Sequence, residues 1–115
     1  MKSQEELAQR VIDAVTRFER DQMSITPADV SVDLHPGSLV VTFRGATSPA
    51  ERDRARDVQA RERLERFHRE VFDQVKPALE TAIQDILGRT VVRSSYNLDV
   101  ASGDGVILFS LAEQR

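Results

Sequence analysis

The sequence predicts an α+β fold in the order α-β-β-α-β-β, with a four-stranded, mainly antiparallel sheet, an N-terminal helix and a long, kinked central helix. Three observations support it. Apolar residues recur at helical spacing over residues 4–21 and 64–86. Two pairs of short apolar segments are each joined by a turn-forming stretch. The chain has 115 residues, 40% of them hydrophobic, so we expect one domain over residues 1–115.

The first helix is predicted over residues 4–21. Ser3 and Glu6 have the spacing of a capping box, in which each side chain binds a free backbone amide of the first helical turn. The apolar side chains that follow recur every three or four residues, namely Leu7, Val11, Ile12, Val15 and Phe18. Residues 22–29 are expected to form a connector to the sheet.

Each pair of predicted strands forms a β-hairpin. Residues 30–34 and 39–44 alternate in polarity and flank a His-Pro-Gly-Ser turn, in which Pro and Gly supply the backbone angles that a turn requires. The second hairpin is predicted from strands at 90–98 and 106–111, joined by a turn at 99–105. Residues 106–111 are nearly all apolar, so this strand is expected to be central or covered on both faces.

The central helix has a strong start signal and a late stop signal. Ser48 is a favourable N-cap, Pro49 suits the first helical position, Glu51 completes a capping box, and Gly88 is typical of a helix end. Between them lies one apolar stripe, formed by Leu64, Phe67, Val71, Val75, Leu79, Ile83 and Ile86.

A single straight helix over residues 49–87 is too long for a compact domain. It would span about 58 Å, whereas the radius of gyration of a domain of this size is only about 13 Å. We therefore expect a kink at Lys76-Pro77, because a proline ring clashes with the preceding helical turn. The charged segment 50–63 either projects or folds as a loosely attached first segment.

Composition excludes several classes of protein. The chain has no Cys, which removes disulfides, thiolate metal sites and cysteine nucleophiles. The formal net charge of -3 argues against a nucleic-acid partner. No apolar run approaches the roughly 20 residues of a membrane-spanning helix, and the first ten residues lack the apolar core of a secretion signal. We expect a cytoplasmic protein without direct membrane insertion.

Residues 51–70 hold seven Arg and six acidic residues. The acids nearly cancel the arginines, and pairs such as Asp57–Arg61 and Glu62–Arg66 have the i,i+4 spacing that supports a helix. A solvated helix face is the favoured interpretation and a nucleic-acid arm the least favoured. The alternative is a partner-binding helix, with candidate contact residues Ala55, Val58, Arg61, Leu64 and Phe67.

Two groups of residues are candidates for binding a small anion or another polar ligand. Arg44, Gly45, Thr47 and Ser48 lie where a strand leads into a helix start, a place where free amides favour negative charge; a plain turn and helix cap is the favoured alternative. Arg93 and Asp99 share one face of the third strand, for which a solvent-exposed face is the alternative.

The remaining polar residues form no recognisable metal-binding or catalytic pattern. His35 and His68 have no His or Cys partner at ligand spacing, so we expect surface or half-buried histidines and no metal. No nucleophile–base pair is present, so we expect no catalytic residues, no cofactor and no enzymatic activity.

Two segments, LVVTFRGATSPAERDRARD and KPALETAIQDILGRTVVRSSYNLDVASGDGVILFSL, resemble the MpsC-like (YbcI-like) family of small bacterial proteins over nearly the whole chain. Ala46 departs from the pattern, which has a larger apolar residue there. The resemblance supplies no catalytic residues, because the matching positions have mainly capping or packing roles. These positions are Gly45, Ser48, Pro49, Glu51, Pro77, Gly88, Asp99 and Phe109.

The resemblance implies a component of a Na⁺-translocating, membrane-potential-generating system, and related gene neighbourhoods include machinery for inorganic-carbon uptake. Together with the missing site chemistry, it predicts a non-enzymatic accessory or regulatory interaction module associated with a membrane ion or bicarbonate transport system. A homodimer is expected, because a second copy would bury the surplus helix and the apolar strand 106–111. The alternative is a small-anion or small-ligand sensor domain.

Overall fold

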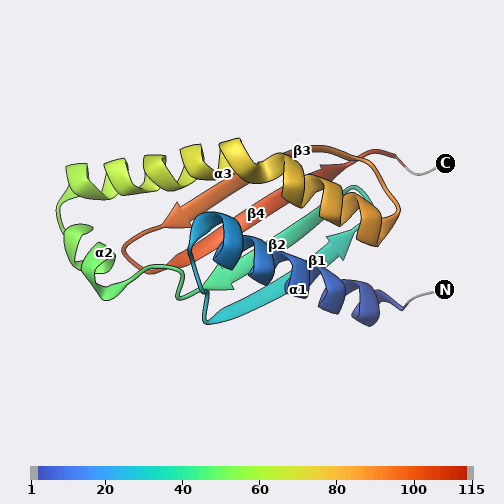
Figure 1. The fold of residues 1–115 in the computed structure, drawn as a ribbon, viewed down its shortest axis with the longest axis horizontal. Coiled ribbons are helices and arrows are strands. Elements are labelled where there is room, and N and C mark those ends of the chain that lie inside the picture. The colour runs from blue at the N-terminus through green and yellow to red at the C-terminus, as the bar shows by residue number, and fades with distance from the viewer. Residues whose placement is uncertain (1–2, 114–115) are drawn as a thin grey trace.

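A four-stranded sheet with helices on one face forms the structure, a computed structural model that describes residues 3–113 (Figure 1). The sheet has the strand order β1-β2-β4-β3, and every neighbouring pair is antiparallel. The predicted fold class is therefore confirmed. In chain order the elements are α1 (Gln4–Met23), β1 (Asp29–His35), β2 (Ser38–Arg44), α2 (Pro49–Arg54), α3 (Val58–Leu87), β3 (Val91–Asp99) and β4 (Asp104–Leu111).

The two hairpins join through their inner strands, within one chain. β2 and β4 are central, and Val41 of β2 lies opposite Ile107 of β4. β1 and β3 are the edge strands, and Val32 and Tyr96 lie opposite the same two central residues. The prediction of a central strand over 106–111 is confirmed, although only one of its faces is covered by helices.

The core lies between the helices and the covered face of the sheet. α1 packs against β1 and α3, and α3 packs against β3. Every second side chain of the two central strands points into this layer, because strand side chains alternate between faces. Fully buried apolar residues of the layer include Val11, Val15, Leu39, Val41, Phe43, Phe72, Leu79, Ile83, Ile107 and Phe109.

The central helix is interrupted at residues 55–57, which agrees with the expectation that a single straight helix over 49–87 is too long for this domain. α2 ends at Arg54, and a new helix starts at Val58 with Asp57 as its N-cap. The Asp57 carboxylate accepts a hydrogen bond from the amide of Ala60 at 2.9 Å, which satisfies a free donor of the first turn. The charged segment 50–63 is therefore divided between α2, a short helix beyond one end of the sheet, and the first turns of α3 (Figure 1).

Pro77 lies inside α3 and does not end the helix. The ribbon of α3 changes direction in its yellow-to-orange part, so the helix follows the sheet rather than running straight (Figure 1). Pro77 is exposed to solvent. A carbonyl that loses its helical partner on an exposed side can bind water instead, which makes the proline tolerable there.

The buried stripe of α3 differs by one position from the predicted stripe near its start. Phe67 was expected to face the core, but its side chain is 57% exposed. His68, expected at the surface or half-buried, is only 7% exposed and lies in line with the buried Phe72. His68 can be buried in place of Phe67 because its imidazole has a hydrogen-bond partner, Glu51.

Candidate functional site

The loop between β2 and α2 holds three of the residues predicted to bind an anion. Gly45 has a positive φ of 65°, and a side chain there would run into Ala28. Thr47 is buried and its hydroxyl donates to the carbonyl oxygen of Val100 at 3.1 Å. Ser48 caps α2, and its amide donates to a carboxylate oxygen of Glu51 at 3.1 Å. The loop is thus tied to the second hairpin and to its own helix.

The polar groups of this loop are already used within the chain. The amide of Ala46 donates to Gly103 at 3.0 Å, and Arg52 donates to the carbonyl of Thr47. Arg44 is exposed at the end of β2. The negative group at the start of α2 is the chain's own carboxylate, so the geometry favours a turn and cap over an anion site.

The buried histidine pairs with the capping glutamate. The Nε2 atom of His68 lies 2.8 Å from a carboxylate oxygen of Glu51. Burial alone would raise the pKa of Glu51, but the hydrogen bonds from His68 and Ser48 outweigh it and hold this pKa below its ordinary value. Both side chains line a hollow of about 380 Å³ between the end of α1 and the start of α2.

A second polar pair lies deeper in the core, without hydrogen bonds. Glu19 has no exposed surface, and neither its carboxylate oxygens nor the hydroxyl of Tyr96 have a partner in the described structure. Burial raises the pKa of Glu19 to about 7. Burial, followed by the charges of Glu19 and Glu51, raises the pKa of Tyr96. The Tyr96 ring stacks between Phe43 and Phe72, with centroid distances of 5.6 and 4.9 Å.

Neither Glu19 nor His68 was identified from sequence as an interior residue. The signal was present, because Glu19 lies four residues after the buried Val15, and His68 lies four after the half-buried Leu64. Both continue an apolar stripe at helical spacing. A polar residue on such a stripe is a candidate buried group, because its position on the helix predicts its burial better than its residue type does.

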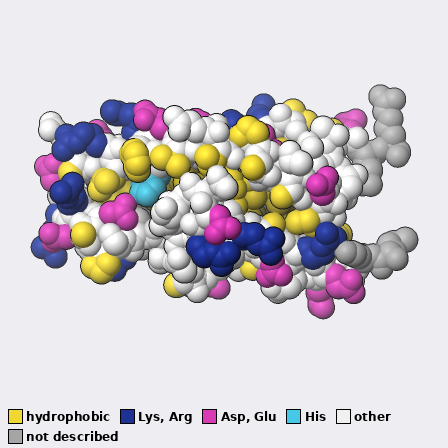
Figure 2. Space-filling model, viewed as in Figure 1, with side chains coloured by type: hydrophobic (Ala, Val, Ile, Leu, Met, Phe, Trp, Pro, Cys, Tyr) yellow, Lys and Arg dark blue, Asp and Glu magenta, His cyan; other side chains and the backbone are white. Residues whose placement is uncertain are grey.

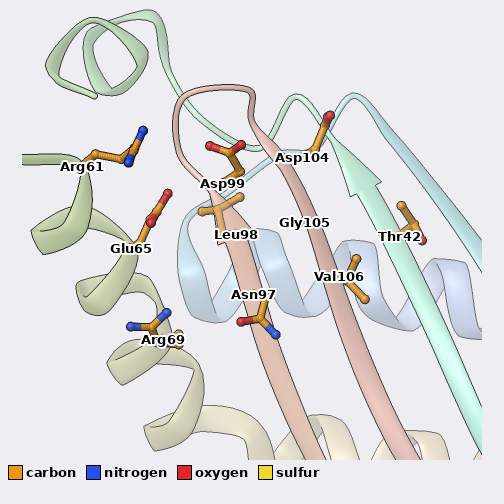
Figure 3. Close-up of a pocket in the computed structure, with 10 residues that line it drawn as sticks. All are labelled: Thr42, Arg61, Glu65, Arg69, Asn97, Leu98, Asp99, Asp104, Gly105 and Val106. Carbon is orange, nitrogen blue, oxygen red and sulfur yellow. The ribbon is translucent and has the colours of Figure 1, made fainter. Parts of the chain in front are cut away.

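A groove beside the start of α3 is lined by other predicted residues (Figure 3). Arg61, Glu65 and Arg69 project from α3 toward the end of β3, where Asn97 and Asp99 lie. The volume is about 620 Å³. This α3–β3 groove brings together Arg61, predicted for the interaction helix, and Asp99, predicted for a ligand site.

Glu65 holds the wall of the α3–β3 groove in place. Its carboxylate accepts a hydrogen bond from the amide of Val100 at 3.1 Å, which links α3 to the turn after β3. The guanidinium groups of Arg61 and Arg69 form no salt bridge with any residue in the range 3–113. Three carboxylates line the same groove, those of Glu65, Asp99 and Asp104, so the groove carries both charges.

Arg93 and Asp99 do not meet within the chain. They lie at opposite ends of β3, about 20 Å apart at the rise of a β-strand. Arg44 lies opposite Asp29, across the β1–β2 ladder. The structure therefore separates Arg93 from Asp99, whereas Thr47 of the other predicted group bonds to Val100, the residue after Asp99.

The residues predicted for an interaction helix divide into buried and exposed sets. Ala55 is only 4% exposed, and Leu64 packs against the core. Val58 and Phe67 are 54% and 57% exposed. Only these two apolar side chains of the set are available to a partner.

The face of the sheet away from the helices has an apolar centre, which we call the open face. Val40 lies opposite Leu108, and Thr42 lies opposite Val106, on the two central strands. Leu108 is 41% exposed and Val106 is 38% exposed, whereas their strand neighbours on the covered face are fully buried. Val92 on β3 is 62% exposed. The edges of this face are polar.

A family described as Na⁺-translocating membrane potential-generating system (MpsC) matches residues 3–113. The chain belongs to the MpsC family. Comparisons with curated proteins and with solved structures give no match.

MpsC membership links the chain to a Na⁺ and membrane-potential system. Among residues 3–113 of this MpsC-family chain, no helix is both long enough and apolar enough to cross a membrane. The same residues contain no group of three or more His, Asp or Glu side chains arranged to hold a metal ion.

Proposed function

We propose that this MpsC-family chain is a non-enzymatic accessory or regulatory interaction module. It acts as a homodimer in the cytoplasm and associates with a membrane ion or bicarbonate transport system, reaching the inner membrane through a protein partner. Family membership supports the membrane context. The open face supports the role in binding and is the observation that carries the proposal.

The open face has the character of a protein-binding surface. Exposed apolar groups gathered on one face, with polar groups around them, are typical of interaction sites. Leu108 and Val106 form the apolar middle, on a rigid central strand. Ser31, Ser95 and Asn97 lie at its sides. An apolar surface on a sheet fits a cytoplasmic segment of a membrane protein that is itself apolar on one side.

Substitution on the open face tests this proposal. The tagged chain is incubated with membranes of its source cell, solubilised gently, and the retained proteins are identified by mass spectrometry. We expect an ion- or bicarbonate-transporting membrane protein with the wild type and its loss with Leu108→Glu. Unfolding curves verify that the variant folds.

Phe67→Glu is the matched control, because Phe67 is an exposed apolar residue on α3 rather than on the sheet. We expect this variant to retain the membrane protein. Loss with Phe67→Glu and retention with Leu108→Glu would move the contact to the predicted interaction helix. Recovery of no membrane protein with the wild type would contradict the proposal.

The α3–β3 groove supports a second candidate function, that of a sensor for a small anion or other small ligand. Arg61 and Arg69 line it together, and a guanidinium binds oxyanions through paired N–H groups. The acids in the groove favour a ligand that also carries a positive group.

Thermal-shift measurements with bicarbonate, phosphate, nucleotides and amino acids, which carry both charges, test the sensor function. A ligand should raise the Tm of the wild type but not that of an Arg61→Gln, Arg69→Gln variant. Arg63→Gln is the control, because Arg63 is exposed and lies outside the groove. The absence of a shift with every ligand would contradict this candidate.

A further inference from the structure

β3 is an edge strand, so one row of its backbone groups faces no other strand of the described chain. In an antiparallel ladder, successive residues direct their amide and carbonyl groups to opposite sides. The amide of Val100 points away from β4, because it donates to Glu65 on α3. Alternation therefore directs the backbone groups of Ser94, Tyr96 and Leu98 away from β4 as well. Side chains of α3 bond to the amides of Val91 and Val100 at the two ends, so the stretch between them is the part that can accept another strand.

The open-face side chains of β3 are arranged symmetrically about Tyr96. Arg93 lies three residues before Tyr96, and Asp99 lies three residues after it. Both side chains are exposed, and neither has an ion-pair partner among the described residues. A strand with this pattern complements a second copy of itself that runs in the opposite direction.

We propose that β3 pairs with β3 of a second copy about a two-fold axis at Tyr96, forming a continuous eight-stranded sheet. Arg93 of each copy then lies opposite Asp99 of the other, and Ser95 lies opposite Asn97. Ser94 and Leu98 exchange backbone hydrogen bonds across the axis. This pairing deepens the proposed function, because it rests on the homodimer and states how it forms.

Charge selects this register among those that the backbone allows. The register can shift only by an even number of residues if the outward backbone groups are to meet. A shift of two places Arg93 opposite Asn97 or Ala101 of the second copy, and both ion pairs are lost. Opposite charges across a strand pair stabilise it, and like charges destabilise it.

The other edge strand, β1, does not carry opposite charges that could pair with a second copy of itself. β1 carries Asp29 and Asp33 on the outer side of the sheet and has no Arg or Lys. β3 is therefore the edge that recognises its own copy by charge, and pairing there leaves the open faces of both copies on the same side of one sheet.

Charge exchange at the two positions tests the pairing. Light scattering gives the mass of the wild type, which we expect to be that of a dimer at micromolar concentration. Arg93→Asp places four acids at the interface and should weaken dimerisation by roughly tenfold or more. Asp99→Arg should have a similar effect, and the double variant R93D/D99R should restore the dimer. Circular dichroism verifies the fold of each variant.

Engineered cysteines test the register directly, because the wild type has none. A mixture of S95C and N97C chains should form a disulfide-linked dimer under mild oxidation. In the mixture, the two cysteines lie directly opposite each other and within reach of a disulfide. In a dimer of either single variant, the two cysteines would lie on the diagonal, about 7–8 Å apart. S31C mixed with S95C is the control, because Ser31 lies on β1.

The outcomes separate the two proposals. A wild-type monomer would overturn both the homodimer and the strand pairing. A dimer that is insensitive to R93D and D99R, or that cross-links equally in single variants, would overturn the β3 pairing while the proposed homodimer stands.

Discussion

Leu108 and Phe109 are neighbours on the central strand β4, yet Phe109 has no exposed surface and Leu108 is 41% exposed. They point to opposite faces of one sheet, and helices cover only the face to which Phe109 points. Figure 2 shows hydrophobic side chains between α1 and α3 on the helical side, framed by charged residues. The comparison shows that an apolar strand need not be buried on both faces, and that the uncovered side is where a partner can bind.

The largest expected effect comes from truncation on the covered face. Phe109→Ala should lower the free energy of unfolding by about 3–5 kcal/mol, because it leaves a cavity in the core. Leu108→Ala should cost only about 1 kcal/mol, because a partly exposed side chain gives up less apolar burial. Urea denaturation at low concentration of the chain measures both. Equal losses would mean that the open face is covered in solution.

The next largest effect on stability is expected at Glu19, because this acidic residue of α1 is fully buried in the core. Its pKa is raised from 4.5 to about 7 in the folded state, so folding favours the protonated form. The wild type should therefore lose stability as pH rises from about 4.5 to 7, by up to about 3 kcal/mol. Glu19→Gln should remove this loss and be the more stable chain at pH 8.

Unfolding curves at pH 4.5 and pH 8 measure this difference. Near pH 4.5 the wild type and Glu19→Gln should have similar stability, because the carboxyl is then protonated in the folded chain. Glu5→Gln is the control, because Glu5 is exposed in the first turn of α1. A wild type with the same stability at both pH values would show that the carboxyl finds a partner in solution.

The smallest of the three effects concerns two glycines. A side chain at Gly105 would overlap the ring of Phe43 on the covered face, so Gly105→Ala should cost about 1–3 kcal/mol. Gly37 has no atom within 4 Å of the position that a side chain would take. Gly37→Ala should change the stability by less than about 0.5 kcal/mol. A larger effect at Gly37 would indicate that the first hairpin turn has a neighbour in solution.

Local signals were sufficient to predict most of the fold. The caps at Ser3 and Ser48 bind the amides that the spacing predicted, and both hairpin turns lie at the predicted positions. A separate first segment of the central helix was one of the two expectations, but the position of the break was not predicted, although Asp57 is a favourable N-cap. Both a proline and an N-cap residue can mark the point where a helix is interrupted. Whether the helix continues through Pro77 depends on whether that side of the helix is exposed to water, and this is set by the tertiary packing.

The site was less predictable than the fold. The approach of His68 to Glu51, and of Glu19 to Tyr96, depends on how α1, α2 and α3 sit on the sheet, and residue spacing within one helix does not contain that information. The position of Arg61 and Asp99 on the walls of one groove depends on the same packing. Arg93 and Asp99 were correctly assigned to one face, but the length of β3 separates them within a single chain.

The pairing of β2 with β4 has a consequence for how the chain folds. Each hairpin is local and can form by itself, but the pairing of Val41 with Ile107 joins segments that lie far apart in the sequence. Closing that long loop costs conformational entropy before the contacts of the core contribute any favourable energy. The rate of folding should therefore be limited by the meeting of the two hairpins, and the nascent chain cannot complete its core until its last strand has been synthesised.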